Sequence, residues 1–203
     1  MKRIIPIFVM AVMLSPGLSL GEMPLNLGGY KLGEDIAKYE DQVNMDSCLQ
    51  VRYMEYVQEA EIRQTAGFKS GLIGFGTCDQ PNKLIRIKLK YTDASKRFYN
   101  QLLKKYKVKF GDPDEWRGDP FHIVIAWKWS FEDVDGRRIS LILQHNTKDS
   151  EEKLGNSVKM TLTSQMEKEQ ACFEKKRTVS REASAPGPGK APGKQDWKLF
   201  IPF

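Results

Sequence analysis

The sequence predicts an α+β domain of two layers, with an antiparallel sheet of about six strands and helices packed on one face. Three observations support this fold class. Segments of alternating apolar and polar residues come in pairs separated by short turns, which is typical of β-hairpins. Other segments carry apolar residues at helical spacing. The order is helix, three strands, helix, three strands, helix, a grouping typical of α+β folds.

The chain begins with the features of a secretory signal. Lys2 and Arg3 precede the apolar stretch 4–14, and the small residues Ser19 and Gly21 predict cleavage after Gly21. An uncleaved N-terminal anchor is the alternative. No later stretch of the sequence is apolar and long enough to span a membrane. We therefore expect an exported protein in the periplasm of a Gram-negative bacterium, with an extracellular location as the second choice.

The composition divides the chain into four regions. Residues 1–21 form the signal peptide, and residues 22–177 form a single α+β domain. Residues 178–196 are rich in Pro, Gly, Ala and Ser, and because such a segment buries little apolar surface we expect a disordered linker. Residues 197–203 form an aromatic C-terminal tip for docking on a partner or on the domain itself. The residues of the tip that we assign to binding are Trp197, Leu199, Phe200 and Phe203.

The formal net charge of +6 does not indicate a nucleic-acid partner. Lys2 and Arg3 leave with the signal, and a charge of +2 lies in residues 178–203, so the folded part carries only about +2. A domain that binds nucleic acid usually has a larger positive excess. We therefore expect no nucleic-acid partner.

The first predicted elements are a short amphipathic helix at 32–43 and a strand at 52–62, a segment that is also compatible with a helix. Strands at 70–78 and 84–91 flank a turn at 79–82. Pairing across this turn places Leu72, Gly74 and Gly76 opposite Leu89, Ile87 and Ile85.

The strand at 84–91 carries a basic stripe. Alternate residues share one of its faces: Arg86, Lys88 and Lys90. Phe75 of the preceding strand is expected beside the stripe, where its ring would stack on an arginine. Lys128 and Lys159 extend the stripe if their strands present them to the same face. The stripe is either a surface for an anion or a partner, or a solvated outer face that resists aggregation.

A second helix is predicted at 93–108, with Asp93 as its N-cap and Gly111 just beyond its end. The loop 110–121 that follows is rich in acidic residues and contains Gly-Asp-Pro twice. It lacks the Asp-x-Asp-x-Asp-Gly spacing of a calcium loop, so turn formation explains most of it. Three residues at its tip have no structural role in this interpretation and are candidates for binding: Asp114, Glu115 and Trp116.

The C-terminal half predicts strands at 121–131 and 138–145, a strand at 157–163 and a closing helix at 164–176. Phe121 is expected to point into the core. A three-residue loop with Gly136 in the left-handed conformation keeps the apolar faces of the first two strands together. This register pairs Phe131 with Ile139, Trp129 with Leu141, and Trp127 with Leu143.

The three cysteines, Cys48, Cys78 and Cys172, predict one disulfide and one remaining thiol in an oxidising compartment. We favour a Cys48–Cys78 bond because both residues lie at the ends of predicted elements, while the other pairings stay open. Cys172 is then a buried thiol or, alternatively, a nucleophile. No Cys-x-x-Cys spacing indicates a redox motif or a structural zinc site.

The two histidines do not form an evident catalytic set. In the predicted register His145 lies opposite Ile125 on the core face, and His122 lies on the other face. A hydrolase that uses His122 with Asp119 or Glu115 is one hypothesis, but no serine stands in a nucleophile elbow. The sequence therefore favours a protein without catalytic activity, and it indicates no cofactor and no metal.

Two short motifs resemble known proteins. The segment YKLGEDI, residues 30–36, resembles the helix start of small bacterial envelope proteins of the BamE/SmpA-like group. The segment LLKKYKVKFGDP, followed by WKWSF and ISLIL, resembles a pattern of uncharacterised exported bacterial proteins. The chain lacks the lipidated cysteine of the first group and has more strands. The resemblance implies an envelope protein without enzymatic activity and assigns no site residues.

We therefore expect an exported protein that binds a protein or another cell-envelope component through its sheet face or its C-terminal tip. The alternatives are a periplasmic protein that binds a small molecule or anion, and the hydrolase described above.

Overall fold

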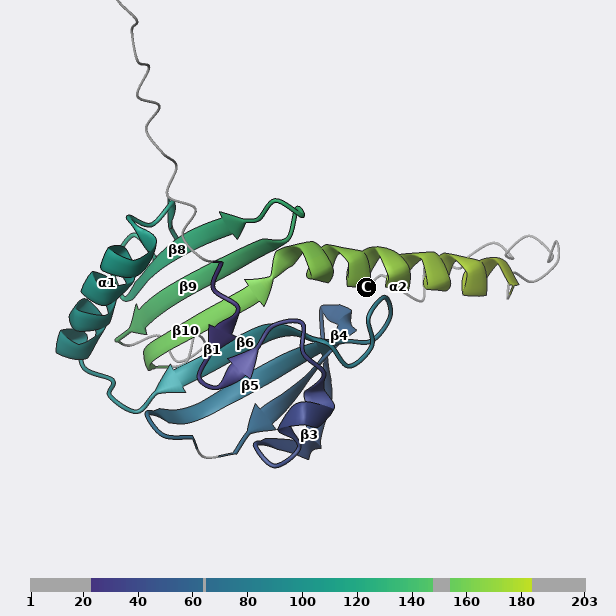
Figure 1. Cartoon of the computed structure of the whole chain (residues 1–203), viewed down its shortest axis with the longest axis horizontal. Helices are drawn as coiled ribbons and strands as arrows, with labels where there is room; N and C mark the ends of the chain where they lie inside the picture. The colour runs from purple at the N-terminus through teal and green to yellow at the C-terminus, as the bar shows by residue number, and fades with distance from the viewer. Residues whose placement is uncertain (1–22, 64, 148–153, 184–203) are drawn as a thin grey trace, which may run out of the picture.

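The structure is a computed structural model that describes residues 23–63, 65–147 and 154–183 (Figure 1). It shows an α+β fold, as predicted, but its main sheet has eight strands instead of about six. The elements in chain order are β1 Asn26–Leu27, β2 Tyr30–Lys31, the 3-10 helix η1 Ile36–Tyr39, β3 Val43–Val51, β4 Met54–Ile62, β5 Phe68–Gly76, β6 Leu84–Tyr91, α1 Lys96–Phe110, β7 Glu115–Trp116, β8 Val124–Glu132, β9 Arg138–Asn146, β10 Gly155–Leu162 and α2 Thr163–Ala183.

Two antiparallel meanders make up the main sheet. The strand order is β3-β4-β5-β6-β10-β9-β8-β7, so the chain runs inward from β3 to β6 and again from β7 to β10. Strands β6 and β10 pair in the centre, where Val158 lies opposite Leu89. Every other strand contact joins sequence neighbours. Helix α1 follows β6 and leads into the second meander.

The core lies against one face of this sheet. Helix α1 covers part of that face, where Tyr106 packs on Trp129. The N-terminal segment covers another part, and the fully buried Tyr30 lies in the same cluster. Figure 1 shows β1 and β2 in front of β6 and β10. The opposite face carries the polar residues of the same strands, because side chains alternate between the two faces of a sheet.

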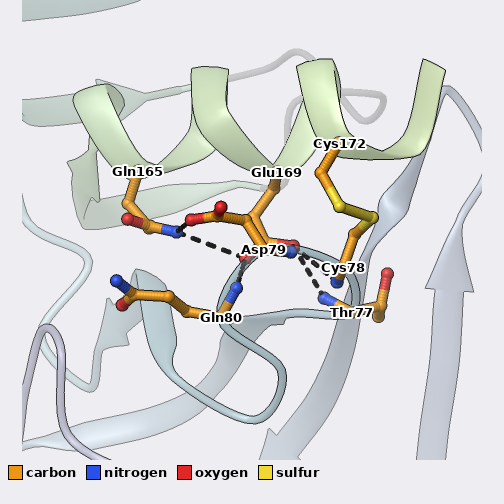
Figure 2. Close-up of a disulfide and its surroundings, with 7 residues drawn as sticks. All are labelled: Thr77, Cys78, Asp79, Gln80, Gln165, Glu169 and Cys172. Atoms are coloured by element: carbon orange, nitrogen blue, oxygen red, sulfur yellow. Dashed lines mark hydrogen bonds between the residues drawn. A yellow bond between two sulfur atoms is a disulfide. The ribbon is translucent and has the colours of Figure 1, made fainter. Parts of the chain in front are cut away.

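Helix α2 crosses the end of the sheet at which β5 and β10 end, and a disulfide and a buried carboxylate are among the contacts that hold it there (Figure 2). Cys172 forms a disulfide with Cys78 in the turn after β5. One turn earlier in α2, the fully buried Glu169 carboxylate accepts four backbone N–H groups at 2.6 to 3.1 Å. The donors are Thr77, Cys78, Asp79 and Gln80. Since a buried carboxylate without donors is costly, the turn and the helix depend on each other.

The predicted helix at 32–43 is wrong over most of its length. Only η1 forms, because the chain before it bonds to β6: Gly33 N donates to Leu84 O at 2.7 Å, and Leu84 N donates to Glu34 O at 2.8 Å. Val43, the last residue of the predicted helix, is buried as the first residue of β3. The sequence did not predict β3, which is an edge strand of the sheet.

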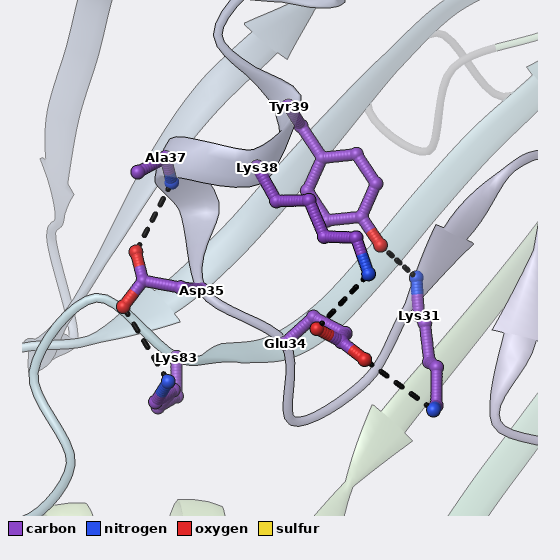
Figure 3. Close-up of polar contacts among 7 residues, drawn as sticks. All are labelled: Lys31, Glu34, Asp35, Ala37, Lys38, Tyr39 and Lys83. Atoms are coloured by element: carbon purple, nitrogen blue, oxygen red, sulfur yellow. Dashed lines mark hydrogen bonds and ion pairs between the residues drawn. The ribbon is translucent and has the colours of Figure 1, made fainter.

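Polar contacts fix η1 in place (Figure 3). The Asp35 side chain caps the helix by accepting Ala37 N at 3.1 Å, and it forms an ion pair with Lys83 at 3.4 Å. The Tyr39 hydroxyl accepts the backbone N–H of Lys31 at 3.0 Å, so both ends of the helix are tied to neighbouring elements.

The predicted strands β4, β5 and β6 all form. The predicted pairing of β5 with β6, however, is shifted by one residue. Ile73, and not Leu72, lies on the core face, opposite Ile87. The turn is longer than predicted because residues 77–80 bind α2, and a bulge interrupts the pairing near the end of β5. A one-residue shift moves each side chain to the other face. Phe75 is therefore buried in the core, at 2% exposure, and does not stand beside the basic stripe.

The predicted hairpin of β8 and β9 has the register we expected: Phe131 pairs with Ile139, Trp129 with Leu141, and Trp127 with Leu143. Gly136 has a φ of +71°. The start of the first strand was wrong. Strand β8 begins at Val124, and Phe121, expected in the core, is 84% exposed.

The start of α1 and the end of α2 differ from the prediction. Ser95, and not Asp93, is the N-cap of α1, and Asp93 instead accepts the N–H of Ser95. Helix α2 runs to Ala183, into the stretch 178–196 that we expected to be linker. The remainder of that stretch, the tip at 197–203 and the signal at 1–21 lie outside the described residues.

Candidate functional site

The register of the main sheet aligns residues from seven strands in one row across the face opposite the core. Each residue of the row is the Cα partner of the next: Glu61, Leu72, Lys88, Lys159, Ile142, Lys128 and Glu115. The basic stripe that the sequence indicates along β6 therefore also extends across the strands. Lys128 and Lys159 share the face of Lys88.

Lys88 and Lys159 lie directly opposite each other near the centre of this row. Like charges at opposed positions of an antiparallel pair destabilise a sheet by up to about 1 kcal/mol. An anion held between two ammonium groups reverses the sign of that interaction. The pair is flanked by the apolar side chains of Leu72 and Ile142, which lie at the adjacent positions of the row.

The same residues line a hollow of about 270 Å³. Its charged lining consists of Lys69, Lys88, Lys90, Lys159 and Glu61. Its apolar lining consists of Ile62, Leu72, Leu89 and Ile142. Gly71 also belongs to the lining, and a Cβ there would lie 2.6 Å from the Leu89 side chain. The hollow therefore combines a positive potential with an apolar wall, and its volume suits a small ligand.

Arg86 shares this face but does not line the hollow. Its guanidinium forms an ion pair with Glu59 at 3.3 Å, and both side chains are only 16% exposed. The contact is an ion pair and not a hydrogen bond, since Arg86 Nε and Glu59 Oε1 have no hydrogen-bond partner among the described residues. The structure thus separates the predicted trio. Lys88 and Lys90 line the hollow, and Arg86 is neutralised beside it.

Glu115 closes the other end of the row. It forms ion pairs with Lys128 at 3.1 Å and with Arg117 at 2.8 Å. The hydrogen bond from Lys128 holds the pKa of the Glu115 carboxyl below its usual value. The charges at this end of the sheet face are therefore paired with one another.

The tip of the acidic loop has the structural role that the sequence did not reveal. The Asp114 side chain accepts the backbone N–H of Ser130 at 2.5 Å. Glu115 and Trp116 form β7, the edge strand that pairs with β8, and the Trp116 ring packs edge-on against Trp127 at 4.8 Å. These contacts give the three residues a structural role, and none of the three lines the hollow.

The proposed catalytic pairing of His122 is not favoured by the geometry. The carboxylate of Asp119 accepts the backbone N–H groups of Phe121 and Val124, and the bond from Val124 holds the pKa of Asp119 below its usual value. Glu115 is engaged by the cations described above. Among the described residues no hydrogen bond joins the His122 ring to either carboxylate; the ring packs on Trp116 instead.

His145 lies on the core face opposite Ile125, as predicted, and belongs to a buried polar cluster. Asn156 donates its amide N–H groups to the carbonyls of Asp93 and Ser95, so its Oδ1 is the acceptor for His145 Nδ1 at 2.6 Å. This network assigns the proton to Nδ1. It ties the start of α1 to β9 and β10, which is a structural role.

The predicted Cys48–Cys78 disulfide is wrong. Cys78 bonds to Cys172, with Cα atoms 5.8 Å apart, and Cys48 is a free thiol on the edge strand β3. The sequence could not show that the closing helix would lie over the turn after β5. Burial raises the pKa of the Cys48 thiol, so its reactive thiolate is scarce at neutral pH.

Within residues 23–63, 65–147 and 154–183, no group of three or more His, Cys, Asp or Glu side chains is placed to hold a metal ion. No helix in this part of the chain is long and apolar enough to cross a membrane. The predicted tip residues Trp197, Leu199, Phe200 and Phe203 lie outside it.

Two charged residues of the hollow were missed at the level of sequence: Lys69 and Glu61. Lys69 lies on β5 and Glu61 on β4, so only the arrangement of the strands brings them into the same hollow as Lys88. The alternation in β6 was the available signal, and it identifies only the residues of its own strand.

The comparisons with known proteins add no relative. No protein-family model matches the chain, and neither a curated protein nor a solved structure matches it significantly.

Proposed function

We propose that the chain is an exported binding protein without catalytic activity, which holds a small anionic ligand in the hollow on its open sheet face. The observation that carries this proposal is the cross-strand pair Lys88 and Lys159, two like charges at directly opposed positions within a concave, partly apolar site. Lys69 and Lys90 add further positive charge around the pair. Such a concentration of one sign of charge attracts anions and raises their local concentration.

The lining suggests the class of the ligand. A carboxylate or phosphate group would lie between the lysines, and a short apolar substituent would contact Leu72 and Ile142. The Glu61 carboxylate at the end of the row would accept a hydrogen bond from a donor on the ligand. Because 270 Å³ lies just below the range of about 300–1,000 Å³ for typical ligand pockets, we expect a compact molecule.

The proposed location is the periplasm. The signal-like residues 1–21 support export, and the Cys78–Cys172 disulfide supports an oxidising compartment, since structural disulfides are rare in the cytosol. An extracellular location has the same two supports.

Thermal-shift and calorimetric titrations of the chain without residues 1–21 test the proposal, with inorganic phosphate, short-chain carboxylates and short-chain alkyl phosphates as ligands. At least one of them should raise the midpoint of unfolding, and the effect should weaken with added salt. The double variant Lys88→Gln/Lys159→Gln should lose the effect. Lys38→Gln is the matched control, because Lys38 is an exposed lysine paired to Glu34 far from the hollow. If the ligand raised the unfolding midpoint of the double variant as much as that of Lys38→Gln, the assignment of the site would be contradicted.

A second candidate is the binding of an envelope protein at β3. This strand is an edge of the sheet. Leu49 within it is 74% exposed, and Tyr53 in the turn that follows is 84% exposed. Exposed apolar residues on an open edge suit the addition of a partner strand. A pull-down from envelope extract with the wild-type chain and with Leu49→Lys tests this candidate. A partner that both chains retain equally would argue against β3 as the contact.

A further inference from the structure

All the charged residues of helix α1 are cationic. Its sequence KRFYNQLLKKYKVKF contains six cations and no acidic residue. All six side chains lie on its solvent side: Lys96, Arg97, Lys104, Lys105, Lys107 and Lys109. The opposite side of the helix packs on the core through Leu102, Tyr106 and Phe110. A basic, amphipathic helix of this kind is typical of a segment that contacts an anionic surface.

These cations are largely uncompensated within the protein. In the part of the chain that the structure describes, Lys107 is the only one of the six with an ion pair, to Asp112 at 2.8 Å. Lys96 and Lys109 instead lie over the rings of Tyr99 and Phe110. Val108 lies among the cations and is 83% exposed, so the outer surface of α1 also offers an apolar side chain.

An apolar hollow opens beside this surface. It has a volume of about 270 Å³ and lies between α1 and the N-terminal segment 24–28. Its apolar lining consists of Pro24, Leu27, Tyr106, Phe110, Leu141 and Met160. Lys105 and Lys109, which are exposed members of the basic surface, line the same hollow. A ligand that fits both features has an anionic head beside the lysines and an apolar chain in the hollow.

We propose that the basic surface of α1 binds an anionic lipid bilayer, with the head group of one lipid at Lys105 and Lys109 and part of its acyl chain in the adjoining hollow. A lipid explains the three observations together: the uncompensated cations, the exposed Val108 and the apolar hollow with a basic lining. Nucleic acid would account only for the cations.

This surface is separate from the lysine pair of the proposed binding site. Helix α1 covers the core face of the sheet, whereas Lys88 and Lys159 point from the opposite face. A chain bound to a bilayer through α1 would therefore keep its open sheet face available. The proposal does not depend on the sheet-face ligand, and each can fail without the other.

Co-sedimentation of the chain without residues 1–21 with lipid vesicles tests the proposal. Vesicles of equal parts phosphatidylcholine and phosphatidylglycerol should bind the chain, and pure phosphatidylcholine vesicles should not. The triple variant Lys104→Gln/Lys105→Gln/Lys109→Gln should partition about a hundredfold less, since each lysine near an anionic surface contributes roughly a factor of five. The matched control Lys88→Gln/Lys159→Gln, on the other face, should bind vesicles like the wild type.

A second pair of variants tests the hollow. Asn26 is exposed in the segment that lines it, so Asn26→Glu introduces a carboxylate at the head-group position and Asn26→Gln adds the same bulk without charge. The first should lower vesicle binding roughly fivefold and the second should leave it unchanged. The proposal would be overturned if the chain bound phosphatidylcholine vesicles as strongly as anionic ones. It would also be overturned if the triple variant bound vesicles like the wild type, or if the two Asn26 variants bound them equally. So would binding to a DNA duplex, lost in the triple variant, without binding to vesicles.

Discussion

The carboxylate of Glu169 occupies the space that a side chain at Gly76 would need. A Cβ on Gly76 would lie 2.5 Å from Glu169 Cδ, well inside any van der Waals contact. Because Gly76 has no side chain, the carboxylate reaches the turn and accepts its four N–H groups. The end of the sheet and helix α2 are therefore joined by a contact that depends on both residues.

Glu169→Ala should lower the free energy of unfolding by about 3 kcal/mol or more, because it leaves buried N–H groups without an acceptor. Glu169→Gln should also destabilise, since its amide N–H groups would face other donors. Urea unfolding measures both. Glu174→Ala, an exposed carboxylate on the same helix, is the control and should stay within about 0.5 kcal/mol of the wild type.

Gly76→Ala should destabilise by about 1 to 3 kcal/mol, because the added methyl group displaces the Glu169 carboxylate. The effect should be strongly non-additive with Glu169→Ala, since both changes break the same contact. A double-mutant cycle on unfolding free energies measures this coupling. Additive losses would show that the two residues act independently.

Loss of the Cys78–Cys172 disulfide should lower the free energy of unfolding by about 4 to 5 kcal/mol. The bond joins residues 94 positions apart, and a crosslink that closes a longer loop restricts the unfolded chain more. Cys172→Ser tests this by chemical unfolding. Cys48→Ser is the control and should change stability little, as Cys48 is free. Thiol labelling of the unreduced chain should modify one cysteine, and labelling after reduction should modify three. Three labelled thiols before reduction would contradict the bond.

Asn156→Ala should destabilise by about 2 kcal/mol or more, because it removes the acceptor of His145 Nδ1 and the side-chain donor to the Asp93 carbonyl. The Ser95 carbonyl loses one of its two donors and keeps the backbone N–H of Tyr99. Asn156→Asp should fail to rescue, since a carboxylate cannot donate to the two carbonyls. Thermal unfolding measures the loss. Asn100→Ala, an exposed position on α1, should be neutral or slightly stabilising. If Asn156→Ala and Asn100→Ala lowered stability equally, the proposed structural role of Asn156 would be contradicted.

Stability should fall in acid in part through Asp119. Its folded pKa is lowered, chiefly by the hydrogen bond from Val124 N–H. A lowered folded pKa stabilises the folded state fully above the unfolded value of about 3.9, and the contribution disappears as the pH falls through the folded value. Asp119→Asn should therefore lower stability at neutral pH and flatten its dependence on pH below about 4. If the unfolding free energies of the variant and of the wild type changed equally with pH below about 4, this role of Asp119 would be contradicted.

The parts of the fold that the sequence predicted are those fixed by local pattern. Alternation and Gly136 determined the register of β8 and β9 because both apolar faces must meet. The turn after β5 was wrong because its residues bind Glu169, which is about ninety positions away and gives no local signal. That single error shifted β5, and with it Phe75, to the opposite face.

The candidate site was predictable only within one strand. The alternation of β6 identified Lys88 and Lys90, whereas the opposed Lys159 comes from the long-range pairing of β6 with β10. The structural contacts of the acidic loop were not predictable for a related reason. Asp114 and Trp116 contact β8, so this structural role is evident only once β7 is placed on the sheet edge.

The Cys78–Cys172 bond also sets a problem of timing for a chain that emerges from its N-terminus. Cys48 and Cys78 are both synthesised before α2, the last described element, which contains Cys172. Under oxidising conditions the first pair of cysteines available to the growing chain is therefore Cys48 and Cys78, and a bond between them would prevent the Cys78–Cys172 bond. Formation of the Cys78–Cys172 bond then requires either a reduced Cys78 until synthesis ends or a later exchange of partners, so the folding of this protein depends on when Cys78 is oxidised.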